Sequence, residues 1–472
     1  MKKIVPILGL AASVMLYLPV AEAAKTKGNS VPASEPFQGR VLVEGLGSPW
    51  EMVWGPDDHL WVTERTGKRI TRVNPKTGAT QVLATLDEAV TGNQQGVLGL
   101  ALSPDFLKEG GQNFVYVVCT YKDGNDLWTK IVRYEYQPSN HKLVSPTPII
   151  DKMPAGDDHN AGRLIFGPDG KLYYSHGEQG HNQGNNVCKP IEAQRLPTEK
   201  EMTDKNWASY VGKVLRMNVD GSVPDDNPVI NGIKSHVFTY GHRNPQGLVF
   251  VGKNLFSVEH GPSTDDEINL LKAGGNYGWP HVAGFRDNQS YVYANWSAAS
   301  DCATLSKKYD PNTIPEGVST QKETDWTEDF IEPLKTFHTV PNGYNFNDKR
   351  CASMPYLCWP TIGPSSVTYY LENGPIPGWE NSLLVSTLKN GAIYRLKLND
   401  DLVTVQGDEV KYFRTDNRYR SVLVAPDSRT IYVATDSEGN GFAQDGTPTQ
   451  KMANPGSILE FTYTGDARKT KK

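Results

Sequence analysis

A short pattern recurs along the chain. An apolar strand ends in a Pro-Asp or Pro-Gln turn, and a second strand rich in aromatic and β-branched residues follows. The copies lie around Met52, Leu100, Leu164, Pro245 and Val422, with a weaker sixth copy at 379–385 that lacks the Pro-Asp. Six imperfect repeats separated by loops are typical of a β-propeller built from four-stranded antiparallel blades.

The fold class that we predict is therefore all-β. We expect a single six-bladed β-propeller domain over residues 38–464, with long inter-blade loops, because no long linker divides the chain. A β-sandwich array is the alternative, but the repeated aromatic second strand favours the propeller. The largest insertion, residues 259–378, is rich in Gly, Asn, Asp, Pro and Trp and is expected to build a site wall or an interface.

The N-terminus has the form of a secretory signal. The initiator Met1 is followed by the basic residues Lys2 and Lys3 and by an apolar run over residues 4–20. Ala21-Glu22-Ala23 is an Ala-x-Ala cleavage pattern. We expect residues 1–23 to be removed, leaving no stable membrane insertion. A retained anchor is the alternative, because the apolar run is near the lower limit for a bilayer span. Residues 24–37 are expected to be flexible, and residues 465–472 form a basic tail.

Charge and cysteine content restrict the partners and the compartment. The formal net charge of −5 and the lack of a basic patch interleaved with aromatics argue against nucleic acid as a partner. In an exported chain, the close pair Cys351 and Cys358 is predicted to form a disulfide. Cys188 and Cys302 are a second candidate pair that spacing cannot establish, and Cys119 lies in an apolar run and is expected to be buried.

Residues 157–183 concentrate groups that could carry chemistry. Asp158, His159, Glu178 and Gln183 flank one strand-forming run. A histidine beside carboxylates is the arrangement of a general base with an orienting partner. The alternative is a loop histidine among solvated carboxylates.

Cationic residues form a second group of candidates. Arg243 has a guanidinium with fixed donors that suit an anion or a developing oxyanion, although a structural Arg capping a turn is equally consistent. Arg418 and Arg420 are two residues apart on a predicted strand and so face the same side. Together with Lys389 they could clamp a polycarboxylate, the alternative being ordinary surface charge.

An acidic, turn-forming segment covers residues 259–269. Calcium takes carboxylate and carbonyl oxygens in irregular loops, so this segment is a candidate calcium site. It does not match an EF-hand, and an ordinary solvated turn is the alternative.

Taken together, these stretches resemble the soluble, periplasmic PQQ-dependent glucose dehydrogenases, six-bladed propellers that oxidise aldose sugars. The resemblance runs from about Val41 to Tyr463. It is carried by Trp54–Asp57, Gly96–Leu100, Asp158–Leu164, Gly241–Phe250, Gly261–Asn269, Gly274–Pro280, Tyr356–Pro360 and Asn417–Arg420. It implies a periplasmic enzyme, usually homodimeric, that needs PQQ and Ca²⁺, oxidises a sugar at C1 to the lactone and passes electrons to an external acceptor.

The resemblance also implies roles for individual residues. His159 matches the general base and Arg243 the group that polarises the quinone, with Asp158 and Glu178 completing the catalytic set. The positions that match cofactor contacts are Gln94, Arg243, Asn244, Thr361, Lys389, Arg418 and Arg420. The positions that match substrate contacts are Gln94, Asp158, Gln183, Tyr356 and Trp359.

Calcium ligands are implied in the same way. The carbonyls of Gly261 and Pro262 match ligands of an ion beside PQQ. The residues on or near structural calcium sites are Asp266, Glu267, Tyr277, Ala283, Phe285, Asp287 and Glu323.

Two residues depart from the family pattern. Glu178 stands where the family has Asp, and His260 stands where it has Gln. The longer Glu178 side chain moves its charge by one methylene, and catalysis tolerates such displacement poorly. We therefore expect Asp at position 178 to preserve or raise turnover.

Two other classes of function stay open. A calcium-dependent propeller lactonase would use metal-activated water and would not need Lys389, Arg418 and Arg420. A non-catalytic propeller binding module would keep its function with alanine at His159.

Overall fold

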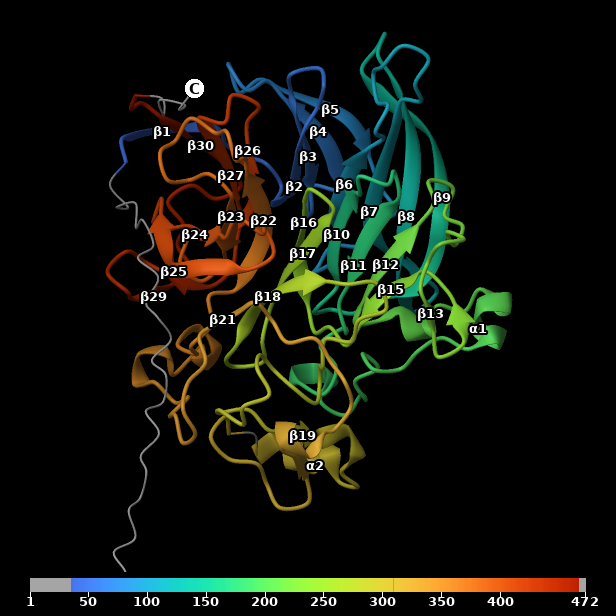
Figure 1. Ribbon diagram of the computed structural model, residues 1–472, viewed down its shortest axis with the longest axis vertical. Coiled ribbons are helices and arrows are strands. Elements are labelled where there is room, and N and C mark those ends of the chain that lie inside the picture. Colours follow the sequence, from blue (N-terminus) through green and yellow to red (C-terminus); the bar gives the residue numbers. More distant parts are fainter. Residues whose placement is uncertain (1–34, 309, 467–472) are drawn as a thin grey trace, which may run out of the picture.

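Six four-stranded antiparallel sheets make up most of the computed structural model, which describes residues 35–308 and 310–466 (Figure 1). The predicted six-bladed β-propeller is confirmed. The expected signal peptide, and most of the segment 24–37 and of the basic tail, lie outside the described residues.

The blades follow the chain order. From the inner to the outer edge, the first blade consists of β2 (Pro49–Trp54), β3 (Leu60–Glu64), β4 (Arg69–Val73) and β5 (Thr80–Thr85). The second consists of β6 (Val97–Leu102), β7 (Phe114–Asp123), β8 (Asp126–Gln137) and β9 (Lys142–Pro154). The third consists of β10 (Ala161–Phe166), β11 (Leu172–His176), β12 (Lys213–Met217) and β15 (Val237–Tyr240). The next two are β16 (Pro245–Val251), β17 (Asn254–Glu259), β18 (Asp266–Leu271), β21 (Lys335–Phe337); and β22 (Pro364–Tyr370), β23 (Ser382–Thr387), β24 (Ile393–Leu398), β25 (Val405–Tyr412).

The last blade is closed by the N-terminal part of the chain. It consists of β26 (Tyr419–Val424), β27 (Thr430–Thr435), β30 (Ile458–Tyr463) and β1 (Phe37–Val43), with β1 and β30 antiparallel. The ring of Phe37 lies 5.4 Å from that of Trp379 and 4.8 Å from that of Phe413. Ordered packing therefore begins inside the segment 24–37 that we expected to be flexible.

Short elements occupy the loops. They are α1 (Glu199–Asp204), α2 (Cys302–Leu305), β13 (Val229–Ile230), β14 (Ile233–Lys234), β19 (Tyr293–Asn295), β20 (Ser319–Gln321), β28 (Gly441–Phe442) and β29 (Pro448–Thr449). The 3-10 turns are η1 (Gly184–Asn186), η2 (Ala208–Tyr210), η3 (Trp296–Ala298), η4 (Ser306–Lys308), η5 (Glu323–Asp325), η6 (Lys349–Cys351) and η7 (Pro355–Leu357).

The five stronger copies of the sequence pattern each supply the first two strands of a blade, and the weaker copy at 379–385 falls on the second strand β23. In two of the copies the contacts of the turn aspartate explain the pattern. Asp57 accepts a hydrogen bond from Nε1 of Trp61 at 3.1 Å and pairs with Nε of Arg72 at 2.6 Å. Asp169 accepts from the hydroxyl of Tyr173 at 2.9 Å in the same way. The turn carboxylate thus ties the aromatic second strand to its neighbours.

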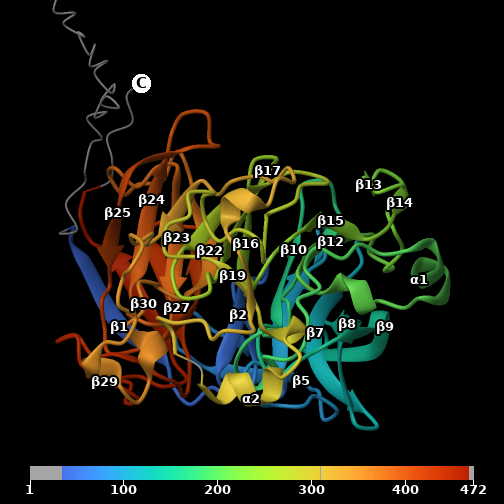
Figure 2. The ribbon, with the colours of Figure 1, turned by 90° about the horizontal axis from the view of Figure 1, so that it is seen from below.

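The inner strands β2, β6, β10, β16, β22 and β26 contact one another in turn and close a ring. Figure 1 looks down this ring, with the labels of the inner strands in order round its centre, whereas Figure 2 shows the propeller edge-on from the side on which β19 and α2 lie. Every inner strand has a register shift close to its first residues, as between Ala161 and Leu164 in β10 and between Pro245 and Gly247 in β16. Such bulges re-aim side chains and are frequent next to active sites.

The expected insertion 259–378 is not one continuous loop, because it contributes β18, β21 and β22 to the blades. Two excursions remain, residues 272–334 and 338–363. Within the first, residues 291–308 and 310–321 form a small lobe, here called the cap lobe, with β19, η3, α2 and β20 (Figure 1). Trp296, Cys302 and Val318 are its buried centre.

Both candidate disulfides form in the structure. The predicted bridge Cys351–Cys358 is confirmed, and Cys188–Cys302 is also bonded, joining positions 114 residues apart. Cys119 is buried, as expected.

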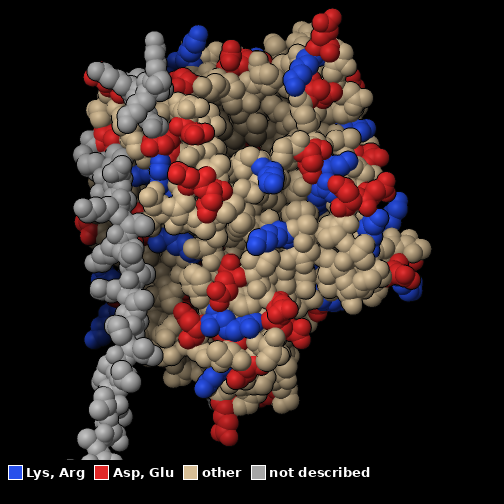
Figure 3. Space-filling model, viewed as in Figure 1, with Lys and Arg blue, Asp and Glu red and all other residues tan. Residues whose placement is uncertain are grey.

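Surface charge is mixed on the face drawn in Figure 3, where Lys and Arg alternate with Asp and Glu. Within residues 35–308 and 310–466, no helix is long and apolar enough to cross a membrane.

Candidate functional site

The predicted site residues lie at one end of the central channel. Antiparallel pairing brings the start of each inner strand beside the end of the second strand. The residues at this end are Gln94 before β6, Asp158 and His159 before β10, Glu178 after β11, Arg243 and Asn244 before β16, Thr361 before β22, Lys389 after β23 and Arg418 before β26.

His159 is held by Glu178. Its Nδ1 lies 2.5 Å from Oε1 of the fully buried Glu178 side chain, whose Oε2 accepts from the backbone N–H of His181 at 2.9 Å. A carboxylate can only accept, so Nδ1 carries the proton and Nε2 keeps its lone pair. The longer Glu178 side chain therefore reaches the histidine.

Gln183 joins His159 to Arg243. Its Oε1 accepts from Nη2 of Arg243 at 2.7 Å, while its amide nitrogen lies 3.2 Å from Nε2 of His159 and 3.4 Å from Oδ2 of Asp158. Gln94 donates to the other oxygen of Asp158. Because Arg243 fixes the amide orientation, Gln183 presents N–H groups to His159, which agrees with an unprotonated Nε2.

The backbone around His159 is unusual. His159 has φ of 43°, in the left-handed region that L residues with side chains seldom adopt. At Gly177 a Cβ would lie 2.0 Å from the carbonyl oxygen of His159, so only glycine fits there. Such conformations persist where the surrounding structure enforces them, and they cluster at functional sites.

Arg243 is buried beside this chain of contacts. Its guanidinium lies 5.4 Å from the ring centre of Trp279, and Nη1 donates to the carbonyl of His260 at 3.3 Å. Its backbone N–H donates to Oε2 of Glu259 at 3.0 Å. Nε of Arg243 has no partner among the described residues, which leaves one buried donor for a ligand.

Asn244 offers a second buried donor. Its Oδ1 accepts from Nε2 of Gln246 at 3.0 Å. Nδ2 of Asn244 has no partner in the described part of the chain. Gln246 also accepts from Nη1 of Arg420 at 3.3 Å and so connects two of the expected cofactor contacts.

Lys389 lies among oxygen acceptors. Its Nζ donates to the carbonyls of Tyr356 and Trp359 at 2.9 and 2.8 Å, and to the hydroxyl of Thr361 at 2.7 Å. Burial lowers the pKa of Lys389 to about 7, and the charge of Asp266 opposes this shift. Lys389 and Thr361 are thus brought together, as expected.

Asp266, one of the expected metal ligands, is held by backbone N–H groups. Its carboxylate accepts from the backbone N–H groups of Gly261, Ile362 and Gly363 at 2.9, 2.6 and 2.8 Å. Burial raises the pKa of Asp266 to about 6. The residue links the Gly261 segment to the loop before β22.

Arg418 and Arg420 lie side by side, as their spacing predicted. Nε of Arg418 lies 3.2 Å from Asp436, and Nε and Nη2 of Arg420 lie 2.8 and 2.9 Å from its two oxygens. Burial alone would raise the pKa of Asp436, but the two guanidinium groups hold this pKa at about 2. Two cations share one carboxylate, so positive charge remains for an anionic ligand.

The aromatic pair expected at the substrate lies next to this cationic group. Tyr356 is 44% exposed, and its hydroxyl accepts from Nδ2 of Asn440. Nε1 of Trp359 is buried without a partner among the described residues. Both residues also give their carbonyls to Lys389.

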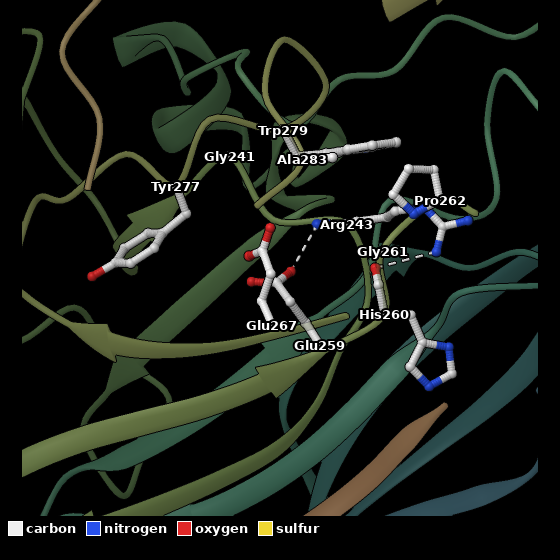
Figure 4. Close-up of a pocket in the computed structure, with 10 residues that line it drawn as sticks. All are labelled: Gly241, Arg243, Glu259, His260, Gly261, Pro262, Glu267, Tyr277, Trp279 and Ala283. Atoms are coloured by element: carbon white, nitrogen blue, oxygen red, sulfur yellow. Dashed lines mark hydrogen bonds between the residues drawn. The ribbon is translucent and has the colours of Figure 1, made fainter. Parts of the chain in front are cut away.

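An acidic pocket adjoins Arg243 (Figure 4). Its lining includes five of the residues expected to hold metal: Gly261, Pro262, Glu267, Tyr277 and Ala283. Nδ2 of Asn269 donates to Glu259 at 2.8 Å and to Glu267 at 3.0 Å. Burial and the nearby charge of Glu259 raise the pKa of Glu267 well above its ordinary value.

Glu323 completes a second carboxylate pair. It accepts from the N–H groups of Ala283 at 3.1 Å and Asn288 at 2.7 Å, while Glu267 accepts from Gly284 at 2.6 Å. Burial raises the pKa of Glu323 to about 7, and the charge of Asp287 adds to the effect. The backbone at 283–284 therefore connects two buried acids, with Phe285 next in the chain.

Gln246 and Asp436 belong to the site but were not assigned a role from the sequence. The available signal was their position. Gln246 lies at the start of an inner strand and Asp436 directly after a second strand, where the other charged site residues lie.

A model of the glucose/sorbosone dehydrogenase family matches residues 46–331 and 335–443, which is most of the chain. The chain belongs to this family. The resemblance to the glucose dehydrogenases is thereby confirmed.

Comparison with individual proteins agrees with this assignment. The chain is 43% identical over 472 residues to quinoprotein glucose dehydrogenase B of Acinetobacter calcoaceticus, covering 97% of this chain and 96% of the other. It is 26% identical over 404 residues to aldose sugar dehydrogenase YliI of Escherichia coli, covering 84% and 89%. The structure of the PQQ-bound aldose sugar dehydrogenase of Streptomyces coelicolor matches with a TM-score of 0.60 and 26% identity, covering 91% and 99%.

Proposed function

We propose that the protein oxidises aldose sugars at C1 to the lactone, using PQQ and Ca²⁺, and passes the electrons to an external acceptor. The observation that carries this proposal is the chain of contacts from Glu178 through His159 and Gln183 to Arg243. In this chain an unprotonated imidazole nitrogen and a guanidinium contact the same Gln183 side chain. Oxidation at C1 needs a base, which the imidazole can supply, and an electrophilic group, which the guanidinium can supply.

In this proposal His159 is the general base. Nε2 takes the proton of the C1 hydroxyl as the C1–H bond breaks and the C=O bond forms. Glu178 keeps the imidazole in the required tautomer and stabilises the imidazolium that forms. Asp158, which accepts hydrogen bonds from Gln94 and Gln183, would also accept a hydrogen bond from a sugar hydroxyl.

Arg243 serves the other half of the reaction. Its guanidinium cannot lose its proton, and its contacts with Gln183, His260 and Trp279 fix its orientation. It would stabilise negative charge that develops on the electron acceptor.

The residues present fit PQQ, which carries three carboxylates. Lys389, Arg418 and Arg420 supply more positive charge than Asp436 neutralises. The unpartnered Nδ2 of Asn244 and Nε of Arg243 are buried donors that a ligand would satisfy. When bound, PQQ supplies a quinone carbonyl that accepts hydride.

The residues also fit Ca²⁺. Glu259 and Glu267 lie together in the pocket with the backbone of Gly261 and Pro262, and one Oδ atom of Asp265 is buried without a partner among the described residues. A cation would relieve the repulsion between these acids. Across the described residues, no group of three or more His, Cys, Asp or Glu side chains converges as a ligand set, so carbonyl oxygens would complete the coordination. When bound, Ca²⁺ acts as a Lewis acid.

The test is reconstitution of the purified protein with PQQ and Ca²⁺, followed by dye reduction with glucose. We expect activity that His159→Ala removes. His141→Ala, in the turn between β8 and β9, is the matched control and should retain it. Tight PQQ binding without oxidation of any aldose would contradict the proposal, and activity retained in His159→Ala would contradict the role of the base.

Export to the periplasm after cleavage at Ala23 and assembly as a homodimer belong to the same proposal. The sequence of residues 1–23 and the family resemblance support them. Mass spectrometry of the protein from the periplasmic fraction should find a chain beginning at residue 24, and light scattering should give twice the mass of one chain. A chain retained with residues 1–23, or a monomeric mass, would contradict these two points separately.

A further inference from the structure

We infer that Asn182 and the Cys188–Cys302 disulfide are positioning residues that hold the cap lobe against the loop after β11 and thereby fix Gln183 between His159 and Arg243. The inference rests on the proposed function for its kinetic consequence. Its structural part stands on contacts in the protein itself.

The loop after β11, residues 177–190, is tied to the described parts of the blades by backbone hydrogen bonds only at its start, where the N–H groups of Glu178 and Gln179 donate to the carbonyls of Arg243 and His159. Its only regular element is the 3-10 turn η1, and it carries Glu178 and Gln183. Loops that lack ladder hydrogen bonds open most readily, so the position of Gln183 depends on other contacts.

Asn182 supplies one such contact. Its Nδ2 donates to the carbonyl of Ala294 at 2.8 Å, and its Oδ1 accepts from the N–H of Ser297 at 3.2 Å. Both polar atoms of the side-chain amide are therefore hydrogen-bonded to the cap lobe. Its own N–H is 3.0 Å from the carbonyls of Asn186 and Lys189. With φ of 61°, Asn182 has the left-handed backbone that Asn tolerates better than most residues.

The disulfide supplies the second contact, beyond Gln183. Cys188 is bonded to Cys302 of α2, and Val187 packs against the buried centre of the cap lobe formed by Trp296 and Val318. Contacts with the cap lobe therefore lie on both sides of Gln183, at Asn182 before it and at Val187 and Cys188 after η1.

The cap lobe is itself attached to the wall of the acidic pocket. Tyr291 lies 5.9 Å from the ring of Trp279, and Gln321 lies 2.6 Å from Nδ1 of His281. Trp279 in turn lies under Arg243. The lobe thus spans from the segment beneath Arg243 to the loop that carries the partner of Arg243.

Asn182→Gly is the most selective test, since glycine keeps the left-handed backbone and removes both side-chain contacts. We expect faster hydrogen exchange across 178–187 in the protein without added PQQ or Ca²⁺, by roughly tenfold or more. We also expect kcat with glucose to fall roughly tenfold while PQQ affinity changes little, since Lys389, Arg418 and Arg420 lie elsewhere. Asn231→Gly, also at a left-handed position (φ 50°) in the β13–β14 turn, is the matched control and should change neither.

A double-mutant cycle separates positioning from general stability. If Asn182 acts through Gln183, Asn182→Gly should have no further effect on kcat in a Gln183→Ala background. Cys188→Ala with Cys302→Ala should raise exchange in the same segment. Unchanged exchange in Asn182→Gly, or an undiminished loss of kcat in the Gln183→Ala background, would overturn the inference. If the wild type does not oxidise aldoses, the proposed function fails, and the exchange measurement still decides the positioning role.

Discussion

Nδ1 of His159 lies 2.5 Å from Oε1 of Glu178, and the Glu178 side chain has no solvent exposure. The same carboxylate accepts from the backbone of His181 at 2.9 Å, so both of its oxygens are used. Glu178, one methylene longer than the aspartate that the resemblance implies at this position, thus makes the orienting contact directly.

This geometry leads us to expect the opposite of our sequence-based expectation for position 178. Glu178→Asp would withdraw the carboxylate from His159 and should lower kcat by about a hundredfold. Glu178→Gln should lower it by about a thousandfold or more, because one amide cannot accept from both Nδ1 of His159 and the N–H of His181. Steady-state kinetics with saturating PQQ checks the order. Equal rates for the three proteins would contradict the orienting role.

Lys389 should control cofactor affinity in a pH-dependent way. With a pKa of about 7, its charge is lost as pH rises above 7, so PQQ binding should weaken there by at most about tenfold per pH unit. Lys389→Met should weaken binding by at least about tenfold and remove this dependence. Calorimetric titration between pH 6 and pH 9 measures both. Lys213→Met is the matched control, since Lys213 is also buried among carbonyl oxygens, with burial lowering its pKa to about 7, but outside the site. An unchanged pH profile in Lys389→Met would refute the assignment.

Metal removal should make the stability fall as pH rises. In the metal-free protein the pKa of Glu323 is raised to about 7 and that of Asp265 to about 6, chiefly by burial. Because their pKa values are raised, the two acids stabilise the folded protein fully below about pH 4, and this stabilisation is lost as pH rises through 6 to 7. For Glu323 the loss in the free energy of unfolding is roughly 3 kcal/mol. With chelator, Tm should therefore fall from pH 5 to pH 8, whereas saturating Ca²⁺ should abolish the fall. The fall in chelator should shrink in Glu323→Gln, and a calcium-independent profile would argue against the metal site.

The two disulfides should differ in their contribution to stability. Cys188–Cys302 closes a segment of 114 residues and Cys351–Cys358 one of 7. On the chain-entropy account, their loss should lower the free energy of unfolding by roughly 5 and roughly 2 kcal/mol. Chemical denaturation of the two double Cys→Ala variants compares them directly. An equal loss for both pairs would show that strain or residual denatured-state structure outweighs loop length.

The blades could be predicted because their cause is local. A turn aspartate such as Asp57 bonds the aromatic residue four positions later, so the repeat is visible in a single stretch. The closure of the last blade by β1 could not be predicted, because Phe37 and Tyr463 pair across almost the whole chain and no local pattern records it.

The same distinction holds for the site. The sequence alone determined which residue types are available: a histidine among carboxylates, three late cations and an acidic Gly-Pro segment. Only the tertiary structure decided that Asp436 holds Arg418 and Arg420, that Gln183 joins His159 to Arg243, and that Cys188 pairs with Cys302. The physical reason is that closure of the propeller brings strand ends from distant blades together at one end of the channel. The partners of the side chains there depend on distances and charges in space, which sequence spacing does not encode.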